Sequence, residues 1–281
     1  MYPILLSEDL VPGIHLFEVG APEVARKARA GQFVVIRIDE QGERIPLTIA
    51  DWNRERGSVT IVFQEAGTTT RRLGELKAGN VIADFVGPLG IPTHIENFGT
   101  VICVAGGVGV APIVPIARVL REAGNKVISI LGARNKGLMF WEEELRRVSD
   151  DIIITTDDGS YGRKGLVTEP LKEILSGSEK IGRVFAIGPT IMMKFASLTT
   201  QPFGVPTIVS LNPIMVDATG MCGSCRISVG GVTRFTCVDG PDFDGHKVNW
   251  DELFARQRQY LDEEKVSLAN WQCRCAERKG A

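Results

Sequence analysis

Four short apolar runs, each followed by a turn or a helical stretch, occupy the middle of the chain. They span 100–105, 127–132, 151–156 and 183–188. Near-continuous apolar runs of this length are typical of strands that are buried on both faces. Their alternation with helical segments, such as 111–123, is typical of βαβ units. Residues 98–210 are therefore predicted to form a parallel sheet covered by helices.

The segments on either side have different patterns. Residues 1–97 hold short strand-like runs, such as 33–38 and 58–63, separated by Gly, Asp and Asn turn signals, which favours a barrel or a sandwich. Residues 211–281 hold a cysteine-rich loop, a hairpin over 226–236 that turns at a Gly-Gly pair, and a charged helix over about 250–264. We predict a β-barrel over 1–97, an α/β domain over 98–210 and a small C-terminal module over 211–281.

Composition excludes several classes of protein. The formal net charge of −2 gives no broad basic field for nucleic acid. No apolar stretch of about 18 residues predicts a membrane span, and the N-terminus has no secretory pattern. The chain is therefore expected to be cytoplasmic. Six cysteines in 281 residues are too few for a disulfide scaffold, so clustered cysteines favour metal binding or catalysis.

A glycine-rich turn follows the first apolar run and opens a helix. It contains Gly106, Gly107, Gly109, Ala111 and Pro112. Glycines allow backbone N–H groups to approach a pyrophosphate, and a helix N-terminus supplies partial positive charge. The alternative is a plain tight turn between strand and helix. After the next strand the chain has Arg134, which either meets an adenine ribose or phosphate or is a solvated loop charge.

Two polar segments of the predicted barrel have the chemistry to hold a flavin nucleotide. Arg44 offers a phosphate a charge-assisted contact, and Thr48 offers a ring nitrogen a hydroxyl. The segment 67–70 offers hydroxyls and backbone amides to a phosphate. The alternatives are a surface arginine and ordinary exposed threonines.

The cysteines of the C-terminal module have the pattern Asp217-x4-Cys222-x2-Cys225-x11-Cys237. This is the spacing of a plant-type iron–sulfur loop with aspartate in place of the first cysteine. A tetrahedral zinc site with three Cys and one Asp is the main alternative, and three free thiols with a turn aspartate is another. The pattern favours a [2Fe–2S] cluster held by these four residues.

The remaining cysteines and histidines suggest no further site. Cys273 and Cys275 are interpreted as two exposed thiols, although a C-x-C pair can bind metal. Cys103 lies in an apolar strand and is predicted to be core. No metal or triad pattern links His15, His94 and His246.

Three motifs together resemble the ferredoxin–NADP reductase-like flavoproteins. They are R-x-P-L-T at 44–48, G-G-x-G-x-A-P at 106–112 and G-P-x-x-M at 188–192. The cysteine loop and the segment 237–246 more narrowly resemble the small, electron-transfer subunits of dihydroorotate dehydrogenase B and of NADH-dependent reduced ferredoxin:NADP oxidoreductase. Aspartate at 217 and the segment 237–246 favour the latter.

The resemblance implies FAD, NAD(H) and a [2Fe–2S] cluster as cofactors, in the barrel, the α/β domain and the C-terminal module respectively. The residues that match the family's flavin motifs are Arg44, Pro46, Leu47, Thr48, Gly67, Thr69 and Thr70, with Thr69 replacing a more usual glycine. The residues that match its nucleotide motifs or join them are Gly106, Gly107, Gly109, Ala111, Pro112, Arg134, Asp157, Asp158, Gly159, Gly188, Pro189 and Met192. Ile187 stands where the family more often has cysteine.

The resemblance also implies an oxidoreductase subunit that needs no acid–base residue of its own. It would pass electrons between NAD(H), FAD and the cluster to a larger partner subunit in a heterodimer, which holds a second flavin and [4Fe–4S] clusters and reacts with ferredoxin and NADP. Such a complex bifurcates electrons. The alternatives are the electron-transfer subunit of dihydroorotate dehydrogenase B and a non-redox module with a zinc knuckle.

Overall fold

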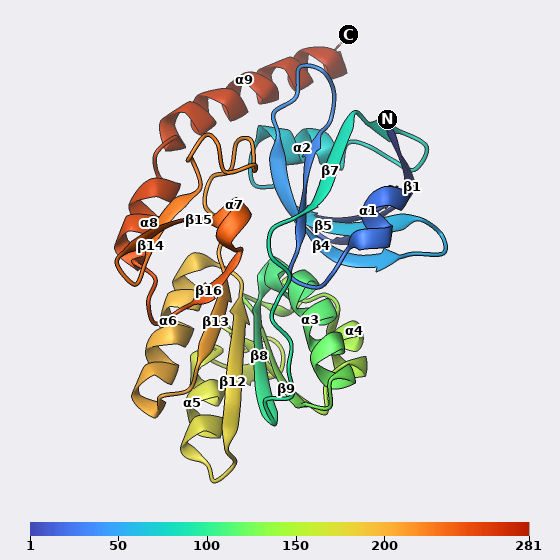
Figure 1. The fold of residues 1–281 in the computed structure, drawn as a ribbon. Coiled ribbons are helices and arrows are strands. Elements are labelled where there is room, and N and C mark those ends of the chain that lie inside the picture. The colour runs from blue at the N-terminus through green and yellow to red at the C-terminus, as the bar shows by residue number, and fades with distance from the viewer. Residues whose placement is uncertain (281) are drawn as a thin grey trace.

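The N-terminal part is an antiparallel, nearly closed barrel, as predicted. The computed structural model describes the backbone of residues 1–280 and the side chains of residues 1–273. The barrel strands follow the spatial order β6-β1-β2-β5-β4-β3-β7 (Figure 1). Their bounds are β1 Tyr2–Val11, β2 Ile14–Gly20, β3 Phe33–Arg37, β4 Ile45–Asn53, β5 Ser58–Gln64, β6 Val81–Ile82 and β7 Asp84–Leu89, with helices α1 Pro22–Lys27 and α2 Thr68–Gly74.

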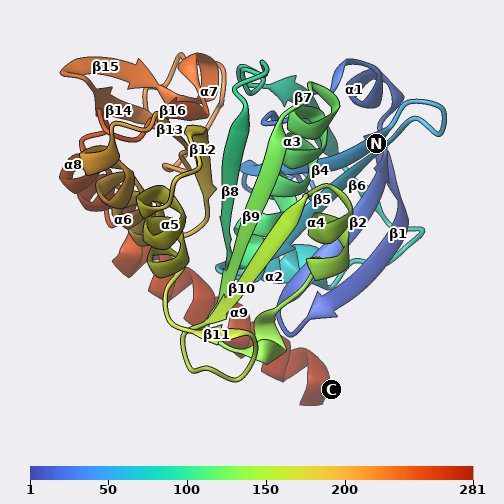
Figure 2. The same ribbon diagram turned by 90° about the horizontal axis from the view of Figure 1, so that it is seen from below.

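The middle part is a parallel sheet, which confirms the βαβ prediction. Its order is β11-β10-β9-β8-β12-β13-β16, and only β16 runs antiparallel to its neighbour. Figure 2 shows α3 and α4 on one face of this sheet and α5 and α6 on the other. The bounds are β8 Thr100–Gly106, η1 Gly107–Gly109, α3 Val110–Glu122, β9 Lys126–Ala133, η2 Lys136–Leu138, α4 Glu142–Arg147, β10 Asp151–Thr156, β11 Arg163–Lys164, α5 Thr168–Ser176, β12 Ile181–Ile187, α6 Thr190–Thr200, η3 Gln201–Phe203, β13 Thr207–Ser210 and β16 Asp242–Asp244.

The C-terminal part consists of a loop, a hairpin and three helices. β14 (Arg226–Val229) and β15 (Val232–Phe235) join through Gly230 and Gly231, both at positive φ, which is the tight hairpin turn that the sequence predicts. α7 spans Thr236–Asp239. The predicted single helix over 250–264 is wrong: it is two helices, α8 (Trp250–Gln257) and α9 (Leu261–Gly280).

Helix α9 turns away from α8 and runs across the barrel, where it lies against α2 (Figure 1). The Ser267 and Thr68 hydroxyls are 2.9 Å apart, and the Arg71 guanidinium lies 5.9 Å from the centre of the Trp271 ring. These contacts hold α9 against the barrel.

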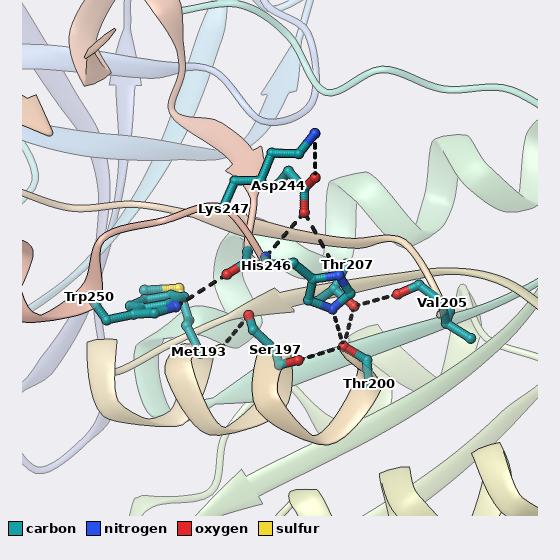
Figure 3. Close-up of polar contacts among 10 residues, drawn as sticks. Met193, Ser197, Thr200, Val205, Thr207, Asp244, His246, Lys247 and Trp250 are labelled. Atoms are coloured by element: carbon teal, nitrogen blue, oxygen red, sulfur yellow. Dashed lines mark hydrogen bonds and ion pairs between the residues drawn. The ribbon is translucent and has the colours of Figure 1, made fainter. Parts of the chain in front are cut away.

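Strand β16 attaches the C-terminal part to the parallel sheet. Next to it, His246 Nε2 lies 2.8 Å from the Thr200 hydroxyl, which also accepts a hydrogen bond from the Thr207 hydroxyl at 2.6 Å (Figure 3). Both threonines are fully buried, so these hydrogen bonds hold the segment after β16 against α6 and β13. Residues Asp242–Asp244 lie in the predicted C-terminal module, but they pair with β13 of the α/β domain. The predicted boundary between 98–210 and 211–281 therefore stays a prediction.

Barrel and sheet share an apolar interface. Helix α3 packs its buried face between β8 and the barrel residues Ile14, Ala50 and Val62. Arg118 of α3 donates to Asp51 Oδ1 at 2.7 Å, and its guanidinium lies 5.3 Å from the centre of the Trp52 ring. Within residues 1–280, no helix is both long enough and apolar enough to cross a bilayer.

Candidate functional site

The predicted nucleotide-binding residues gather at the carboxyl edge of the parallel sheet. The glycine-rich turn follows β8, Arg134 follows β9, Asp157 to Gly159 follow β10, and Gly188 and Pro189 follow β12. The chain leaves β8 toward β9 and later returns to β12 on the other side of β8, so β8 and β12 border the switch point of the sheet. Open α/β sheets bind their ligands at this crevice.

Two of the glycines in the turn after β8 allow close packing, and a third leaves open space. A Cβ on Gly109 would overlap the Ile187 carbonyl, and a Cβ on Gly106 would overlap the Met192 sulfur. These two glycines therefore allow the turns after β8 and β12 to pack together. Gly107 has φ +52° and open space where a Cβ would lie. Of the three glycines, it is Gly107 that leaves room for a ligand above the turn.

Arg134 and the aspartates after β10 lie side by side. The Asp158 N–H donates to the Arg134 carbonyl at 3.3 Å, and the Asp157 N–H donates to the Ala133 carbonyl at 3.1 Å. Hydrogen bonds from Ser160 lower the pKa of the Asp158 carboxyl. The Arg134 side chain is exposed, as are both carboxylates. The edge thus offers a nucleotide one cation and two anions on neighbouring loops.

The predicted flavin residues of β4 divide between the two faces of the barrel wall. Ile45, Leu47 and Ile49 pack against the barrel core. Because side chains alternate along a strand, Pro46 and Thr48 face outward. Leu47 therefore contributes its side chain to the core, and only its backbone is open to the outer face. Arg44 is exposed and forms no ion pair among the described residues.

The second predicted flavin segment begins helix α2. Thr70 Oγ1 accepts hydrogen bonds from the N–H groups of Ala66 and Gly67 at 2.9 and 3.0 Å, so Thr70 shapes the turn. The Thr69 hydroxyl donates to Glu43 Oε2 at 2.7 Å. A Cβ on Gly67 would meet nothing within 4 Å. The open position is Gly67, while both threonine hydroxyls are engaged within the protein.

The cysteine loop is wound by residues in the left-handed conformation. Ala218, Gly220 and Gly223 have φ of +58°, +84° and +67°. Asp217 closes the loop, because its two carboxylate oxygens accept from the N–H groups of Thr219 and Cys222, each at 2.9 Å. These hydrogen bonds lower the pKa of Asp217. Successive backbone N–H groups in such a winding point inward and favour an anionic group.

The thiols of this loop do not occupy equivalent positions. Cys225 and Cys237 are buried, with their sulfurs 3.3 Å apart. Burial and the Cys225 thiol raise the pKa of Cys237 to about 12. Cys222 is exposed and lies 3.2 Å from the Ser224 hydroxyl, which lowers its pKa. Among the described side chains, no three His, Cys, Asp or Glu converge at single-ion distance. The predicted ligands instead form two pairs, Asp217 with Cys222 and Cys225 with Cys237.

The buried thiol pair packs directly on the barrel. Phe33 and Val35 of β3 form one apolar cluster with Cys225 and Cys237. Phe33 is the cross-strand partner of Thr48, and Val35 is that of Pro46. Directly opposed residues point to the same face of a sheet. Pro46 and Thr48, two of the predicted flavin residues, therefore lie on the same face of the barrel wall as the thiol pair.

A buried carboxyl in this region was not predicted from the sequence. Asp242 Oδ2 accepts from the Thr93 hydroxyl at 2.6 Å, while Oδ1 is buried with no hydrogen-bond partner among the described residues. Burial raises the pKa of Asp242 to about 6, against the opposing effect of nearby hydroxyls. The position of Asp242 in β16, beside the loop after β7, could not be read from the local sequence.

Two family models match parts of the chain. Residues 212–249 match the iron–sulfur cluster binding domain of dihydroorotate dehydrogenase B. Residues 103–198 match the oxidoreductase NAD-binding domain. The first range contains all four predicted cluster ligands, and the second contains the predicted nucleotide residues from Gly106 to Met192.

Proteins similar over nearly the whole chain include two electron-transfer subunits. The dihydroorotate dehydrogenase B electron-transfer subunit homologue of Thermotoga maritima is 51% identical, with 94% of this chain and 92% of that protein covered. The electron-transfer subunit of dihydroorotate dehydrogenase B from Desulforamulus reducens is 32% identical, with 88% and 97% covered. A chain in the solved structure of NADH-dependent reduced ferredoxin–NADP oxidoreductase, described in terms of flavin-based electron bifurcation, aligns with a TM-score of 0.91 at 47% identity, covering 97% of this chain and 98% of that one.

Proposed function

The chain belongs to the family of dihydroorotate dehydrogenase B electron-transfer subunits and their homologues, and we propose that it carries electrons between NAD(H) and a partner subunit through FAD and a [2Fe–2S] cluster. Bound flavin supplies the exchange between two-electron hydride transfer and single-electron transfer. The protein's own task is to hold the three groups in order and in contact range.

The single observation that carries this proposal is the continuity of the three sites across the barrel wall. The glycine-rich turn contacts β5. β5 pairs with β4, β4 pairs with β3, and β3 packs on the thiol pair. Strands in a sheet lie about 4.8 Å apart. The residues proposed for the nucleotide, the flavin and the cluster are thus connected through neighbouring strands, which supports the proposed order of electron transfer.

The residues of the cluster loop fit a two-iron group. We propose Cys225 and Cys237 as ligands of one iron, and Asp217 and Cys222 as ligands of the other. Two sulfur ligands on one tetrahedral metal, each with a bond of about 2.3 Å, lie about 3.8 Å apart. The sulfurs of Cys225 and Cys237 lie 3.3 Å apart, which is close to that separation. A carboxylate has lone pairs left after accepting two N–H groups, so the loop-closing role of Asp217 and a ligand role are compatible.

The residues of the nucleotide and flavin sites would act through binding alone. We propose that Gly107 lets the nucleotide pyrophosphate approach the start of α3, with Arg134 beside the adenine end. Thr48 would hydrogen-bond the flavin ring, and Arg44 and the Gly67 turn would hold its phosphates. The other matched residues, Pro46, Leu47, Thr69, Thr70, Gly106, Gly109, Ala111, Pro112, Asp157, Asp158, Gly159, Gly188, Pro189 and Met192, shape these surfaces.

Anaerobic reduction of the purified protein tests the function. NADH should bleach the flavin absorbance and then produce the EPR signal of a reduced cluster. Substituting Cys225→Ser or Cys237→Ser should lower the iron content and abolish the EPR signal while the flavin still bleaches. Cys103→Ser, in the buried strand β8, is the matched control and should keep both signals. A colourless zinc-containing protein would contradict the proposal.

Asp217 is tested separately from the thiols. Asp217→Ala and Asp217→Cys should each change the EPR spectrum, since an oxygen ligand and a sulfur ligand tune iron differently. Asp239→Ala is the control, because Asp239 also accepts a backbone N–H, from Phe235 at 2.7 Å, and lies close to Cys237. Unchanged iron content and spectra in both Asp217 variants would show that Asp217 only closes the loop.

We further propose that the partner is a larger flavin- and [4Fe–4S]-containing subunit of an electron-bifurcating ferredoxin:NADP oxidoreductase. The similarity at 47% identity over nearly all of both chains supports this assignment. The alternative partner is a dihydroorotate dehydrogenase, supported by the 32% identical relative. Purification of the native complex distinguishes the two, because only the first partner would bring additional iron–sulfur clusters.

A further inference from the structure

One hydroxyl beside the buried thiol pair has no hydrogen-bond partner. It belongs to Thr236, which is fully buried and immediately precedes Cys237. Among the side chains that the structure describes, Thr236 Oγ1 is the one buried hydroxyl oxygen that neither donates nor accepts a hydrogen bond. Leaving a buried polar group unpaired costs free energy, so a partner is expected for it.

Thr236 stands opposite the other buried thiol. Strands β14 and β15 pair with Arg226 opposite Phe235, and the next pair in this register is Cys225 with Thr236. The Thr236 N–H donates to the Cys225 carbonyl at 3.2 Å, so the pairing continues to this point. Directly opposed residues of an antiparallel pair point to the same face. The Thr236 side chain therefore lies on the face of the hairpin that carries the Cys225 sulfur.

The described residues offer this hydroxyl no acceptor. Neither thiol of the pair accepts a hydrogen bond from it. The residues packed around the two thiols are apolar, namely Phe33, Val35, Met215 and Ala218. A buried water typically makes about three hydrogen bonds to polar groups, which apolar side chains do not supply. The missing partner is therefore a group that the folded chain receives from outside.

Packing alone does not require a hydroxyl at position 236. Valine has nearly the shape of threonine and would fill the same space without an unpaired oxygen. Threonine thus carries a cost that valine would avoid, and an incoming acceptor offsets this cost. In the proposed function that acceptor is the [2Fe–2S] cluster, since Cys225 and Cys237 are two of its proposed ligands and cluster sulfurs accept hydrogen bonds.

We propose that the Thr236 hydroxyl donates a hydrogen bond to a sulfur of the cluster and thereby raises the reduction potential of the cluster. The inference rests on the proposed function, because it needs the cluster to be bound. Reduction adds one electron, so the negative charge on the sulfurs grows and the hydrogen bond strengthens. In a buried site of low dielectric, the donor stabilises the reduced form more than the oxidised form. Thr236 therefore helps to set how readily the cluster takes an electron from the flavin.

The test measures the reduction potential of the cluster in the flavin- and iron-loaded chain, by dye-mediated titration followed by EPR. Thr236→Val removes the hydroxyl and keeps the shape, while Thr236→Ser keeps the hydroxyl. Thr207→Val is the matched control, because the Thr207 hydroxyl is equally buried but donates to Thr200 Oγ1 at 2.6 Å in the α/β domain. Thr236→Val should lower the equilibrium constant for reduction roughly tenfold, a fall of about 59 mV for a one-electron couple, while the other two variants stay within about twofold of the original protein.

The melting temperature of the iron-free protein checks whether the hydroxyl is unpaired. Thr207→Val breaks a buried hydrogen bond and should lower the melting temperature, whereas Thr236→Val should not lower it. This measurement needs no cluster, so it also decides the question for a variant that assembles the cluster poorly. A fall in Thr236→Val as large as that in Thr207→Val would show that a bound water already pairs the hydroxyl, and it would overturn the proposal.

Two further outcomes would count against the role of Thr236. An unchanged potential in Thr236→Val would overturn the proposal. So would an equal fall in Thr236→Ser, because that result would follow from altered packing and not from the loss of a donor. Both outcomes leave the proposed function standing, since the cluster would still be present and reducible. Absence of iron, sulfide and an EPR signal from the original protein would instead refute the proposed function.

Discussion

Phe33 and Thr48 are directly opposed on strands β3 and β4 and point to the same face of the barrel. Phe33 packs at the same time against Cys225 and Cys237. One aromatic side chain therefore separates the residue proposed to touch the flavin ring from the thiols proposed to hold iron. Both faces of β3 are buried here, because Val34 and Ile36 face the barrel core while Phe33 and Val35 are covered by the cluster module. This explains why residues 33–36 form an unbroken apolar run.

Phe33→Ala should disturb both sides of this contact. The cavity should destabilise the protein by about 3–5 kcal/mol, and the thiol pair should lose its apolar support. We expect a lower melting temperature, together with faster loss of iron to a chelator, measured from the visible circular dichroism of the cluster.

The control for Phe33 is Phe17→Ala in the barrel core. Phe17 is also fully buried, but it belongs to a different apolar cluster, without cysteines. It should lower the melting temperature by a similar amount and leave the rate of iron loss below the transition unchanged. Equal iron loss in both variants would mean that Phe33 supports the barrel only.

Two glycines of the nucleotide turn should respond differently to alanine. Gly109→Ala places a methyl group against the Ile187 carbonyl. We expect this overpacking to lower the free energy of unfolding by about 1–3 kcal/mol. Gly107→Ala meets no atom and costs only about 1 kcal/mol for its left-handed backbone. Its methyl group instead enters the space proposed for the pyrophosphate. Gly107→Ala should therefore weaken NADH binding, measured by flavin bleaching at graded NADH, with little change in melting temperature.

Local patterns predicted most elements of the fold. The helix expected over 111–123 is Val110–Glu122, and the hairpin expected at 226–236 is Arg226–Phe235. Such elements are predictable because their periodicity and turn residues lie within a short stretch of sequence. The split of the last helix at 258–260 was missed, because no Gly or Pro marks it.

The spatial relationships between motifs were not predictable in the same way. The opposition of Phe33 and Thr48 depends on strand register, and the inward side chain of Leu47 depends on which face of β4 is buried. The unsatisfied carboxyl of Asp242 arises where segments far apart in sequence meet, because its partner Thr93 lies in the loop after β7. The chemistry of each site could be predicted from its residue types, whereas the path between the sites required the packing.

Asp242 makes stability depend on pH. The pKa of its carboxyl is about 6 in the folded protein, above the ordinary value of 3.8. The folded state thus holds the proton more tightly, and this stability is present below pH 4 and is lost as pH rises through 6. The loss is up to about 3 kcal/mol. Asp242→Asn removes the ionisation, so its gain in melting temperature over the original protein should be larger at pH 7.5 than at pH 5.0. Asp239→Asn, in α7, is the control, and an equal gain at both pH values in Asp242→Asn would contradict this assignment.

The pairing of thiols predicts which disulfide forms once iron is removed. The sulfurs of Cys225 and Cys237 are 3.3 Å apart, while Cys222 lies beside Ser224 on the exposed side of the loop. Diamide takes two electrons and two protons from two thiols, so in the iron-free protein it should join Cys225 to Cys237. Peptide mapping by mass spectrometry should find this link and leave Cys222 free for alkylation. A dominant Cys222–Cys225 link would instead show that the iron-free loop rearranges and brings together the two cysteines that are nearest in sequence. In that case the two-pair arrangement would not be a property of the folded chain, and the assignment of ligands to separate irons would lose its geometric basis.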